Sequence, residues 1–258
     1  MNKFIVPFWE EMNNIVKSEI LDIKNADFLN HYVIRDCMYT SSYETQKYIY
    51  QLQLIDKQFG YDYTNWILND EPLFGNPELL EYRPGLVCSG NSIQMLYHIA
   101  YWQEKTGLSI SNINSILEWG GGYGSMARII KKINPNLSYK IIDTEVFSSL
   151  QKWYLDTCNP SNDIETLTVD QIDLDTIDYE MFISTWALSE SSPDAIDFVA
   201  QKLSVINCDH FLLAFQVSQE KFEKAGDIVD ILNMYKLEKI ENIELVPYLS
   251  AGDKYATR

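Results

Sequence analysis

The sequence predicts an α/β protein in which a Rossmann-like parallel sheet carries helices on both faces and follows a helical N-terminal region. Beyond residue 85, short apolar runs alternate with amphipathic helical patterns. Parallel strands joined by helical crossovers produce this alternation. Residues 1 to about 75 instead show helical spacing without the period of two that is typical of strands. The 258 residues are 46% hydrophobic, which is enough for a sizeable core.

The N-terminal region has helical spacing in "FWEEMNNIVKSEIL" and "SSYETQKYIYQLQLI". The stretch "NDEPLFGNPELLEYRPGL" then contains three prolines and two glycines, a composition that interrupts helices and strands. We therefore expect a helical cap or lid over residues 1–85 and a ligand-binding domain over residues 86–258.

The second domain is expected to begin with a helix over residues 89–107, with Ser89 or Asn91 near its N-cap and Gly107 at its end. Strands and helices then alternate. The expected strands are residues 115–118, 137–143, 164–169, 179–187 and 210–216, and the expected helices are residues 125–132, 144–157 and 192–206. The segment "KLEKIENIEL", residues 236–245, has enough alternation for a late strand.

Composition and charge exclude several classes of protein. The net charge of −17 disfavours binding to nucleic acid or to anionic lipid. The four cysteines are widely separated without CxxC spacing, so we expect neither a zinc site nor a disulfide framework, and no metal is expected. The apolar run near the N-terminus is too short for a signal peptide or a membrane span. A cytoplasmic location is the resulting expectation.

The stretch "ILEWGGGYGSMARII" places glycines 120, 122 and 124 in the first strand-to-helix turn of the expected sheet. A nucleotide-like ligand lies against bare backbone at such a turn, although a glycine turn can also be purely structural. A dinucleotide fingerprint would have Gly or Ala at position 125, where this chain has Ser125. Glu118, at the tip of the strand, favours a cationic or amino-bearing ligand over a pyrophosphate.

Asp143 follows the second expected strand in "YKIIDTEVF". A carboxylate at this place can accept hydrogen bonds from both ribose hydroxyls of an adenosine. The same residue could serve as the N-cap of the helix that starts near Thr144, and the two roles are compatible.

Three blocks, "LEWGGGYGSMARII", "YKIIDTEVFSSLQKWYL" and "FISTWALSESS", resemble class I S-adenosylmethionine-dependent methyltransferases. More narrowly, they resemble the sugar O-methyltransferases of bacterial capsule and polysaccharide gene clusters. The resemblance spans about residues 85–216. It implies that a Rossmann-like domain binds S-adenosylmethionine through Gly120, Gly122 and Gly124 beneath the methionine moiety, Glu118 near its amino group, Asp143 at the ribose, and Asp170 or Gln171 at the adenine. Trp119 departs from the usual aliphatic residue and is expected to narrow the pocket.

Methyl transfer is an in-line displacement, so the enzyme mainly aligns the acceptor and excludes water. A neutral sugar hydroxyl must also lose its proton, which favours a carboxylate or histidine within hydrogen-bond reach. Glu190 is the first candidate base, although Ser189 and Glu190 could instead cap the next helix. His98, expected near the mouth of the pocket, is the second candidate, with a structural role as the alternative.

Three further residues are candidates for the pocket. Tyr123 lies inside the glycine turn, where we expect it to contribute to catalysis. Ser184 and Trp186 follow the fourth expected strand, and both are expected to contact the cofactor. Trp186 could stack on adenine or a sugar ring, or could simply belong to the core.

The sequence thus predicts an S-adenosylmethionine-dependent methyltransferase that acts on a hydroxyl of a sugar or nucleotide-linked precursor in surface polysaccharide biosynthesis. Alternatives are a phosphate, phosphoramidate or amine-bearing capsule precursor as acceptor, and a non-catalytic adenosyl-binding or assembly protein. A nicotinamide-dependent dehydrogenase is disfavoured by Ser125 and Glu118. We expect a small-molecule acceptor and no nucleic acid as partner, and a homodimer remains open.

Overall fold

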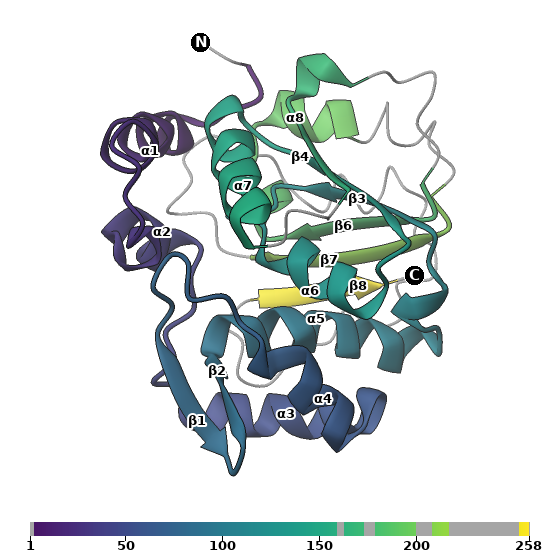
Figure 1. The fold of residues 1–258 in the computed structure, drawn as a ribbon. Coiled ribbons are helices and arrows are strands. Elements are labelled where there is room, and N and C mark those ends of the chain that lie inside the picture. The colour runs from purple at the N-terminus through teal and green to yellow at the C-terminus, as the bar shows by residue number, and fades with distance from the viewer. Residues whose placement is uncertain (1–2, 159–162, 173–178, 200–207, 217–252, 258) are drawn as a thin grey trace.

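The computed structural model describes residues 3–158, 163–172, 179–199, 208–216 and 253–257. Within these residues the main sheet has six strands in the order β5-β4-β3-β6-β7-β8 (Figure 1). The first five run parallel and β8 pairs antiparallel with β7. The strands are β3 Ser115–Trp119, β4 Ser138–Ile142, β5 Ile164–Leu167, β6 Met181–Thr185, β7 His210–Gln216 and β8 Asp253–Thr257. The predicted fold class is confirmed.

The helices also follow the expected order. They are α1 Pro7–Val16, α2 Tyr32–Cys37, α3 Thr45–Phe59, α4 Tyr61–Asn69, α5 Gly90–Thr106, α6 Ser125–Ile133, α7 Glu145–Cys158 and α8 Pro193–Phe198. Short helical turns are η1 Lys17–Leu21, η2 Phe28–Asn30, η3 Ile110–Asn112, η4 Val169–Gln171 and η5 Ala187–Glu190. The N-cap of α5 is Ser89, whose hydroxyl accepts a hydrogen bond from the Ser92 N–H at 3.1 Å.

The strand order reverses beside β3. The chain proceeds from β3 to β4 and β5 on one side, then returns to place β6 on the other side of β3. In an open parallel sheet, this reversal leaves a crevice at the carboxyl ends of the two strands, where ligands bind. The glycine turn, which directly follows β3, lies at this crevice.

Both faces of the sheet are buried. Along β3, Ile116 and Leu117 belong to different core clusters, as expected where successive side chains alternate between faces. The larger cluster contains apolar side chains of α5, α6 and α7, and the smaller one contains side chains of α8. The predicted cover of helices on both faces is therefore present.

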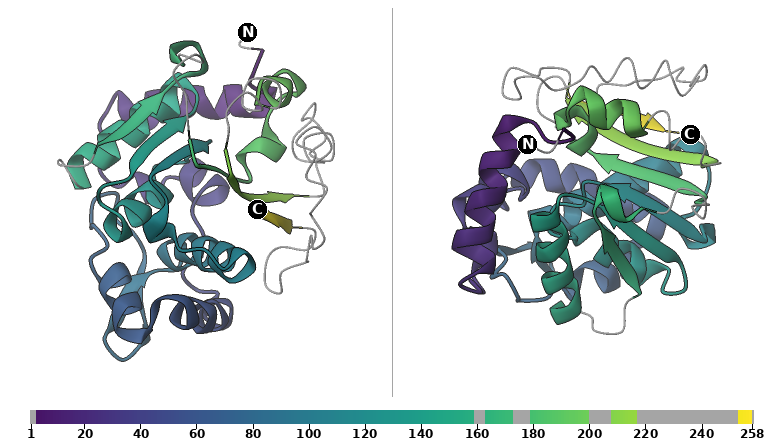
Figure 2. Two further views of the ribbon diagram at one scale, coloured as in Figure 1. Left: turned by 90° about the vertical axis from the view of Figure 1, so that its right-hand side faces the viewer. Right: turned by 90° about the horizontal axis from the view of Figure 1, so that it is seen from above.

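The N-terminal helices share the larger core cluster. In Figure 1, α3 and α4 lie outside α5, and α3 packs along α5. Figure 2 (right) shows α1, in purple, along one side of the molecule. The Trp9 ring of α1 packs edge-on against Phe147 of α7, with 5.8 Å between the ring centroids.

A hairpin that the sequence did not predict joins the two regions. Its antiparallel strands are β1 Leu79–Arg83 and β2 Leu86–Ser89, and Gly85 turns between them with φ 77°. The expected boundary between residues 85 and 86 falls at this turn. Of the prolines and glycines in this stretch, Pro84 and Gly85 form the turn of the hairpin, and the other three precede β1.

Other elements differ in extent from the prediction. The fourth expected strand ends at Thr185 because Trp186 adopts a positive φ of 65°. The helix predicted to extend to residue 206 is observed as α8 through Phe198, and residues 200–207 lie outside the described residues. The late strand predicted at residues 236–245 also lies outside them. None of the described helices is both long and apolar enough to span a bilayer.

Candidate functional site

A cavity of about 780 Å³ opens at the carboxyl ends of β3, β4 and β6. Its walls come from the turns after these strands, from η4, from the segment before α1, and from α1, α2, α3 and α5. Such a volume suits a cofactor together with a small molecule. Nine predicted site residues line it: Glu118, Gly120, Gly122, Tyr123, Asp143, Asp170, Gln171, Trp186 and Glu190. Gly124, Ser184 and His98 are not part of the lining.

The glycine turn needs glycine for two separate reasons. Gly120, Gly122 and Gly124 have φ values of 74°, 56° and 100°, which strain any residue with a Cβ atom. A Cβ on Gly120 would also lie 2.0 Å from the Ala187 Cβ. Gly124 precedes α6 and packs against Leu155, so its place is explained by helix packing rather than by the cavity.

Glu118 is buried in the cavity wall and is only 1% exposed. It accepts a hydrogen bond from the Tyr139 hydroxyl at 2.9 Å. Burial raises the pKa of Glu118 to about 7, the hydrogen bond from Tyr139 opposes this rise, and the charge of Asp143 adds to it. A cation placed beside this carboxyl group would favour its ionised form.

Asp143 lies at the carboxyl end of β4 with its carboxylate at the cavity. One carboxylate oxygen accepts from the Thr144 N–H at 2.8 Å and the other from Gln151 Nε2 at 2.7 Å. Burial raises the pKa of Asp143 to about 7, and these hydrogen bonds oppose the rise. In the first turn of α7 the Phe147 N–H donates to the hydroxyl of Thr144 rather than to Asp143, so Asp143 is not the helix cap.

Gln151 is a structural partner that the sequence analysis missed. Its side-chain nitrogen donates to the Gly122 carbonyl at 3.0 Å as well as to Asp143, and it thereby ties the glycine turn to the acid. The signal was present in the pattern of α7, where Gln151 occupies a buried position among apolar residues. A buried polar side chain requires partners, and here the partners are the cavity's own backbone and carboxylate.

Asp170 and Gln171 lie on η4, at the rim of the cavity. The Gln171 carbonyl oxygen accepts from the Thr168 N–H at 2.9 Å, as part of a capping box. This hydrogen bond holds the side-chain carbonyl of Gln171 against the backbone. The carboxylate of Asp170 is exposed beside it.

Ser184 and Trp186 have different roles at the end of β6. The Ser184 hydroxyl donates to the Trp119 carbonyl at 3.0 Å and accepts from the Leu188 N–H at 3.2 Å, so it braces the strand ends behind the cavity. Trp186 lines the cavity with φ 65° and ψ −37°. Such strained residues tend to occur at functional sites.

Glu190 is 7% exposed and lines the cavity at the end of η5. The alternative that Ser189 or Glu190 caps the following helix is wrong. Ser192 is the N-cap of α8 and accepts from the Ala195 N–H at 3.2 Å, while the Ser189 hydroxyl donates to the Trp186 carbonyl at 2.7 Å. The carboxylate of Glu190 is therefore not needed to begin α8.

Tyr123 lies in the cavity wall, where its hydroxyl accepts a hydrogen bond from Asn91 Nδ2 at 2.6 Å. Burial raises the pKa of Tyr123 well above its ordinary value, so the phenol stays neutral. It is suited to donating or accepting hydrogen bonds rather than to removing a proton.

His98 does not reach the mouth of the pocket, which corrects the expectation from the sequence. It is fully buried on α5, with its ring centroid 5.0 Å from that of Trp186 and its Nε2 3.2 Å from Gln94 Nε2. Burial, with a smaller contribution from the charge of Lys47, lowers the pKa of His98 to about 3. The ring thus lies behind the cavity wall as a neutral and very weak base.

The strand order, the glycine turn at its reversal and the cavity together define a doubly wound, Rossmann-like α/β protein. No family model and no curated protein sequence matches the chain.

Solved structures with a similar fold include methyltransferases. The mitomycin 7-O-methyltransferase MmcR has 13% identity and a TM-score of 0.43 over 64% of this chain and 56% of that chain. An O-methyltransferase family protein from Burkholderia thailandensis has 8% identity and a TM-score of 0.43 over 65% and 58%. PigF with SAH has 12% identity and a TM-score of 0.43 over 97% and 70%. The first two matches span less than two thirds of the length of those chains. Similarity this distant does not establish an activity, which is therefore argued from the site.

Proposed function

We propose that this protein is an S-adenosylmethionine-dependent methyltransferase. The observation that carries the proposal is the pair of carboxyl groups, Glu118 and Asp143, which line one cavity beside a turn of bare glycine backbone. S-adenosylmethionine carries a cationic amino group and a sulfonium, together with a ribose that has two hydroxyls. Two carboxylates and an open backbone match these groups, whereas Glu118 would repel the pyrophosphate of a dinucleotide.

In this proposal each wall of the cavity binds a different part of the cofactor. Gly120 and Gly122 leave room for the methionine moiety, Glu118 pairs with its amino group, and Asp143 accepts from the ribose hydroxyls. Gln151 supports this arrangement because it holds Asp143 and the Gly122 carbonyl in fixed relation. Asp170, at the rim formed by η4, is the residue proposed to contact the adenine.

When bound, the cofactor supplies a methyl group that is already activated by its sulfonium. The chain's own residues then have to hold the acceptor in line with that group and exclude water. Glu190 is the proposed base: it would take the proton that the acceptor hydroxyl loses as the new bond to carbon forms. Its place in the cavity wall, at the end of η5, supports this role.

For the acceptor, we propose a hydroxyl of a sugar or nucleotide-linked precursor of a surface polysaccharide, on the basis of the sequence resemblance alone. The alternatives remain a phosphate, phosphoramidate or amine-bearing precursor, and a protein that binds the cofactor without turnover. The cytoplasmic location, the division at residue 85 and a homodimer likewise stay predictions.

The first test is calorimetric titration with S-adenosylhomocysteine, run beside NAD. Wild-type protein should bind the former in the micromolar range and not the latter. Asp143→Ala should weaken binding by about 1.5 to 3 kcal/mol, because it removes hydrogen bonds to a charged group. Asp156→Ala is the matched control, since Asp156 lies on the same helix, α7, and is paired with Lys152 on its exposed face. Equal affinity of wild type and Asp143→Ala would refute the ribose role, and binding of NAD alone would refute the cofactor.

A second test concerns chemistry. With a panel of sugar nucleotides and radiolabelled S-adenosylmethionine, transfer that falls in Glu190→Gln while S-adenosylhomocysteine affinity is kept would support Glu190 as the base. Transfer that is unaffected by this substitution would favour an acceptor that has no proton to lose.

A further inference from the structure

The charges around the cavity are unevenly distributed. Its lining includes five acidic side chains and, among the described residues that line it, a single cation, Lys47. The acids are Glu118, Asp143, Glu145, Asp170 and Glu190. Four of them follow the carboxyl ends of strands, whereas Lys47 belongs to α3 in the N-terminal region. The cavity therefore has one cationic wall that the proposed cofactor, itself a cation, does not use.

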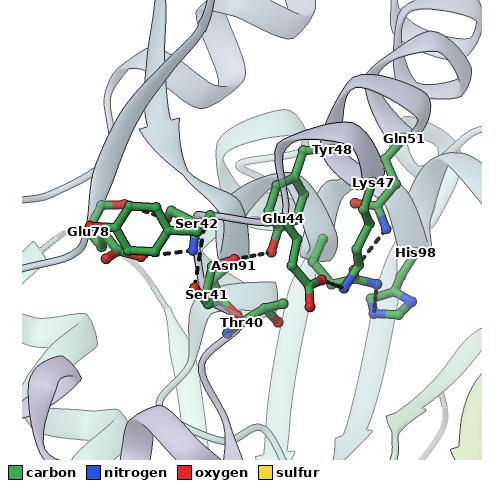
Figure 3. Close-up of polar contacts among 12 residues, drawn as sticks. Thr40, Ser41, Ser42, Glu44, Lys47, Tyr48, Gln51, Glu78, Asn91 and His98 are labelled. Carbon is green, nitrogen blue, oxygen red and sulfur yellow. Dashed lines mark hydrogen bonds and ion pairs between the residues drawn. The ribbon is translucent and has the colours of Figure 1, made fainter. Parts of the chain in front are cut away.

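Lys47 is held in the wall rather than extended into solvent. Its side chain is 15% exposed, its Nζ lies 3.0 Å from a carboxylate oxygen of Glu44, and its ammonium lies 5.5 Å from the centre of the Tyr48 ring. Figure 3 shows it between Glu44 and His98, and its charge is one of the causes that lower the pKa of His98. Glu44 is 58% exposed, so this ion pair is partly hydrated and weak.

Two amide side chains of α5, Asn91 and Gln94, line the same cavity as Lys47, and hydrogen bonds fix their orientations. The Gln94 carbonyl oxygen accepts from Gln51 at 2.8 Å, and its nitrogen lies 3.2 Å from His98 Nε2. The Asn91 carbonyl oxygen accepts from the Thr40 N–H at 3.3 Å, and its nitrogen donates to Tyr123. The bonds to Thr40, Gln51 and His98 are drawn in Figure 3. Supports of this kind preorganise a binding surface.

We propose that Lys47, together with Gln94 of the same cavity wall, forms an anion-binding subsite for a phosphate or carboxylate group on the methyl acceptor. In a chain with net charge −17, an anionic acceptor needs a local cation to enter the cavity. Lys47 also stands in the first turn of α3, where the helix dipole adds positive potential. His98 acts here as a positioning residue that orients the Gln94 amide. The name "acceptor" rests on the proposed function, but the anion site itself does not.

The experiment is calorimetric titration of the full chain with two probes, inorganic pyrophosphate and glucuronate, at low ionic strength to limit screening. Each titration is run with and without saturating S-adenosylhomocysteine. Pyrophosphate binding would identify a phosphate site and glucuronate binding a carboxylate site. Lys47→Gln should lower the affinity for the probe about tenfold or more, which is the range for loss of a hydrogen bond to a charged group. Lys57→Gln, on the same helix but paired with Glu104, should leave it unchanged.

A second variant should act in the opposite direction. Glu44→Gln removes the carboxylate that competes for Lys47, so the probe should bind several-fold more tightly. Glu104→Gln, which removes the partner of Lys57, is its control and should have no effect. Loss in Lys47→Gln together with gain in Glu44→Gln would support the subsite.

The subsite is overturned if neither probe binds wild type, or if binding is the same in Lys47→Gln. Failure of the proposed function would give a different result, namely no binding of S-adenosylhomocysteine to the same samples. The difference in probe affinity between wild type and Lys47→Gln would still test the subsite.

Discussion

Glu118 is buried and Asp143 is partly buried in the wall of one cavity, and desolvation raises the pKa of each to about 7. The ionised forms attract an amino group and accept hydrogen bonds with both oxygens, whereas a protonated carboxyl group is neutral and accepts mainly with its carbonyl oxygen. As pH falls through 7, both groups take up protons, so they lose the charge and accept hydrogen bonds less strongly. The cavity should therefore bind the proposed cofactor less well in mildly acidic solution.

The affinity for S-adenosylhomocysteine should accordingly rise between pH 6 and pH 8, by up to about tenfold per pH unit for each group that must ionise. Calorimetry at several pH values, in buffers of different ionisation enthalpy, would record the affinity and the protons released. Glu118→Gln should flatten the profile as well as weaken binding. A pH-independent affinity in wild type would contradict the involvement of either carboxyl group.

The same shift has the opposite consequence for stability. Because the folded-state pKa of Glu118 lies above its ordinary value, its contribution to stability is present at low pH and is lost as pH rises from about 4.5 to about 7. At pH 8, Glu118→Gln should raise the free energy of unfolding by about 2 to 3 kcal/mol, while at pH 4 it should have little effect. Urea unfolding at both pH values measures this, and a variant that is less stable than wild type at pH 8 would contradict it.

At the scale of elements, the turn from β3 into α6 is fixed by its contact with η5. Gly120→Ala should destabilise the protein strongly, because its Cβ would collide with the Ala187 Cβ and because φ is positive. The double variant Gly120→Ala with Ala187→Gly removes the collision and leaves the backbone strain at position 120, about 1 to 2 kcal/mol, together with a cost of about 0.5 to 1 kcal/mol for glycine at position 187. Thermal unfolding should show partial recovery in the double variant. If the destabilising effects of the two substitutions were simply additive, the contact with Ala187 would not explain why position 120 is a glycine.

Local signals predicted most of the elements. The Ser89 cap, the helical spacing of α3 and the apolar runs of β3 and β4 are properties of short segments, which a sequence displays directly. The hairpin β1–β2 was missed because prolines and glycines mark linkers and tight turns alike. β8 was missed because its pairing with β7 is a contact between segments that are distant in the chain.

On the scale of the whole molecule, the N-terminal helices and the sheet bury one common core cluster. Ile55 of α3 and Ile93 of α5 both belong to it, so residues 1–85 cannot leave without exposing α5. We expect one cooperative unfolding transition, recorded alike by far-ultraviolet circular dichroism and by hydrogen exchange in α3 and β3. Separate transitions for α3 and β3 would instead favour an independently folding lid.

The candidate site was predictable only where it lies near the glycine turn. Glu118 and Asp143 stand at strand ends in recognisable spacing, and the structure places both at the cavity. Lys47, Gln94 and Gln151 were not identified because their place depends on how α3, α5 and α7 pack around the sheet. His98 was misplaced for the same reason, since the face of α5 that carries it is covered by Trp186.

The segment before α1 and the first turn of α1 line the cavity and contact α8. The Ser192 hydroxyl donates to the Lys3 carbonyl at 2.6 Å, Phe4 packs on Phe198, and Trp9 lines the cavity beside Phe147. Binding of a ligand in the cavity should therefore change the environment of the Trp9 indole, which is far in sequence from the glycine turn. The intrinsic fluorescence of Trp9, assigned by comparison with Trp9→Phe, should change on ligand binding without any added label.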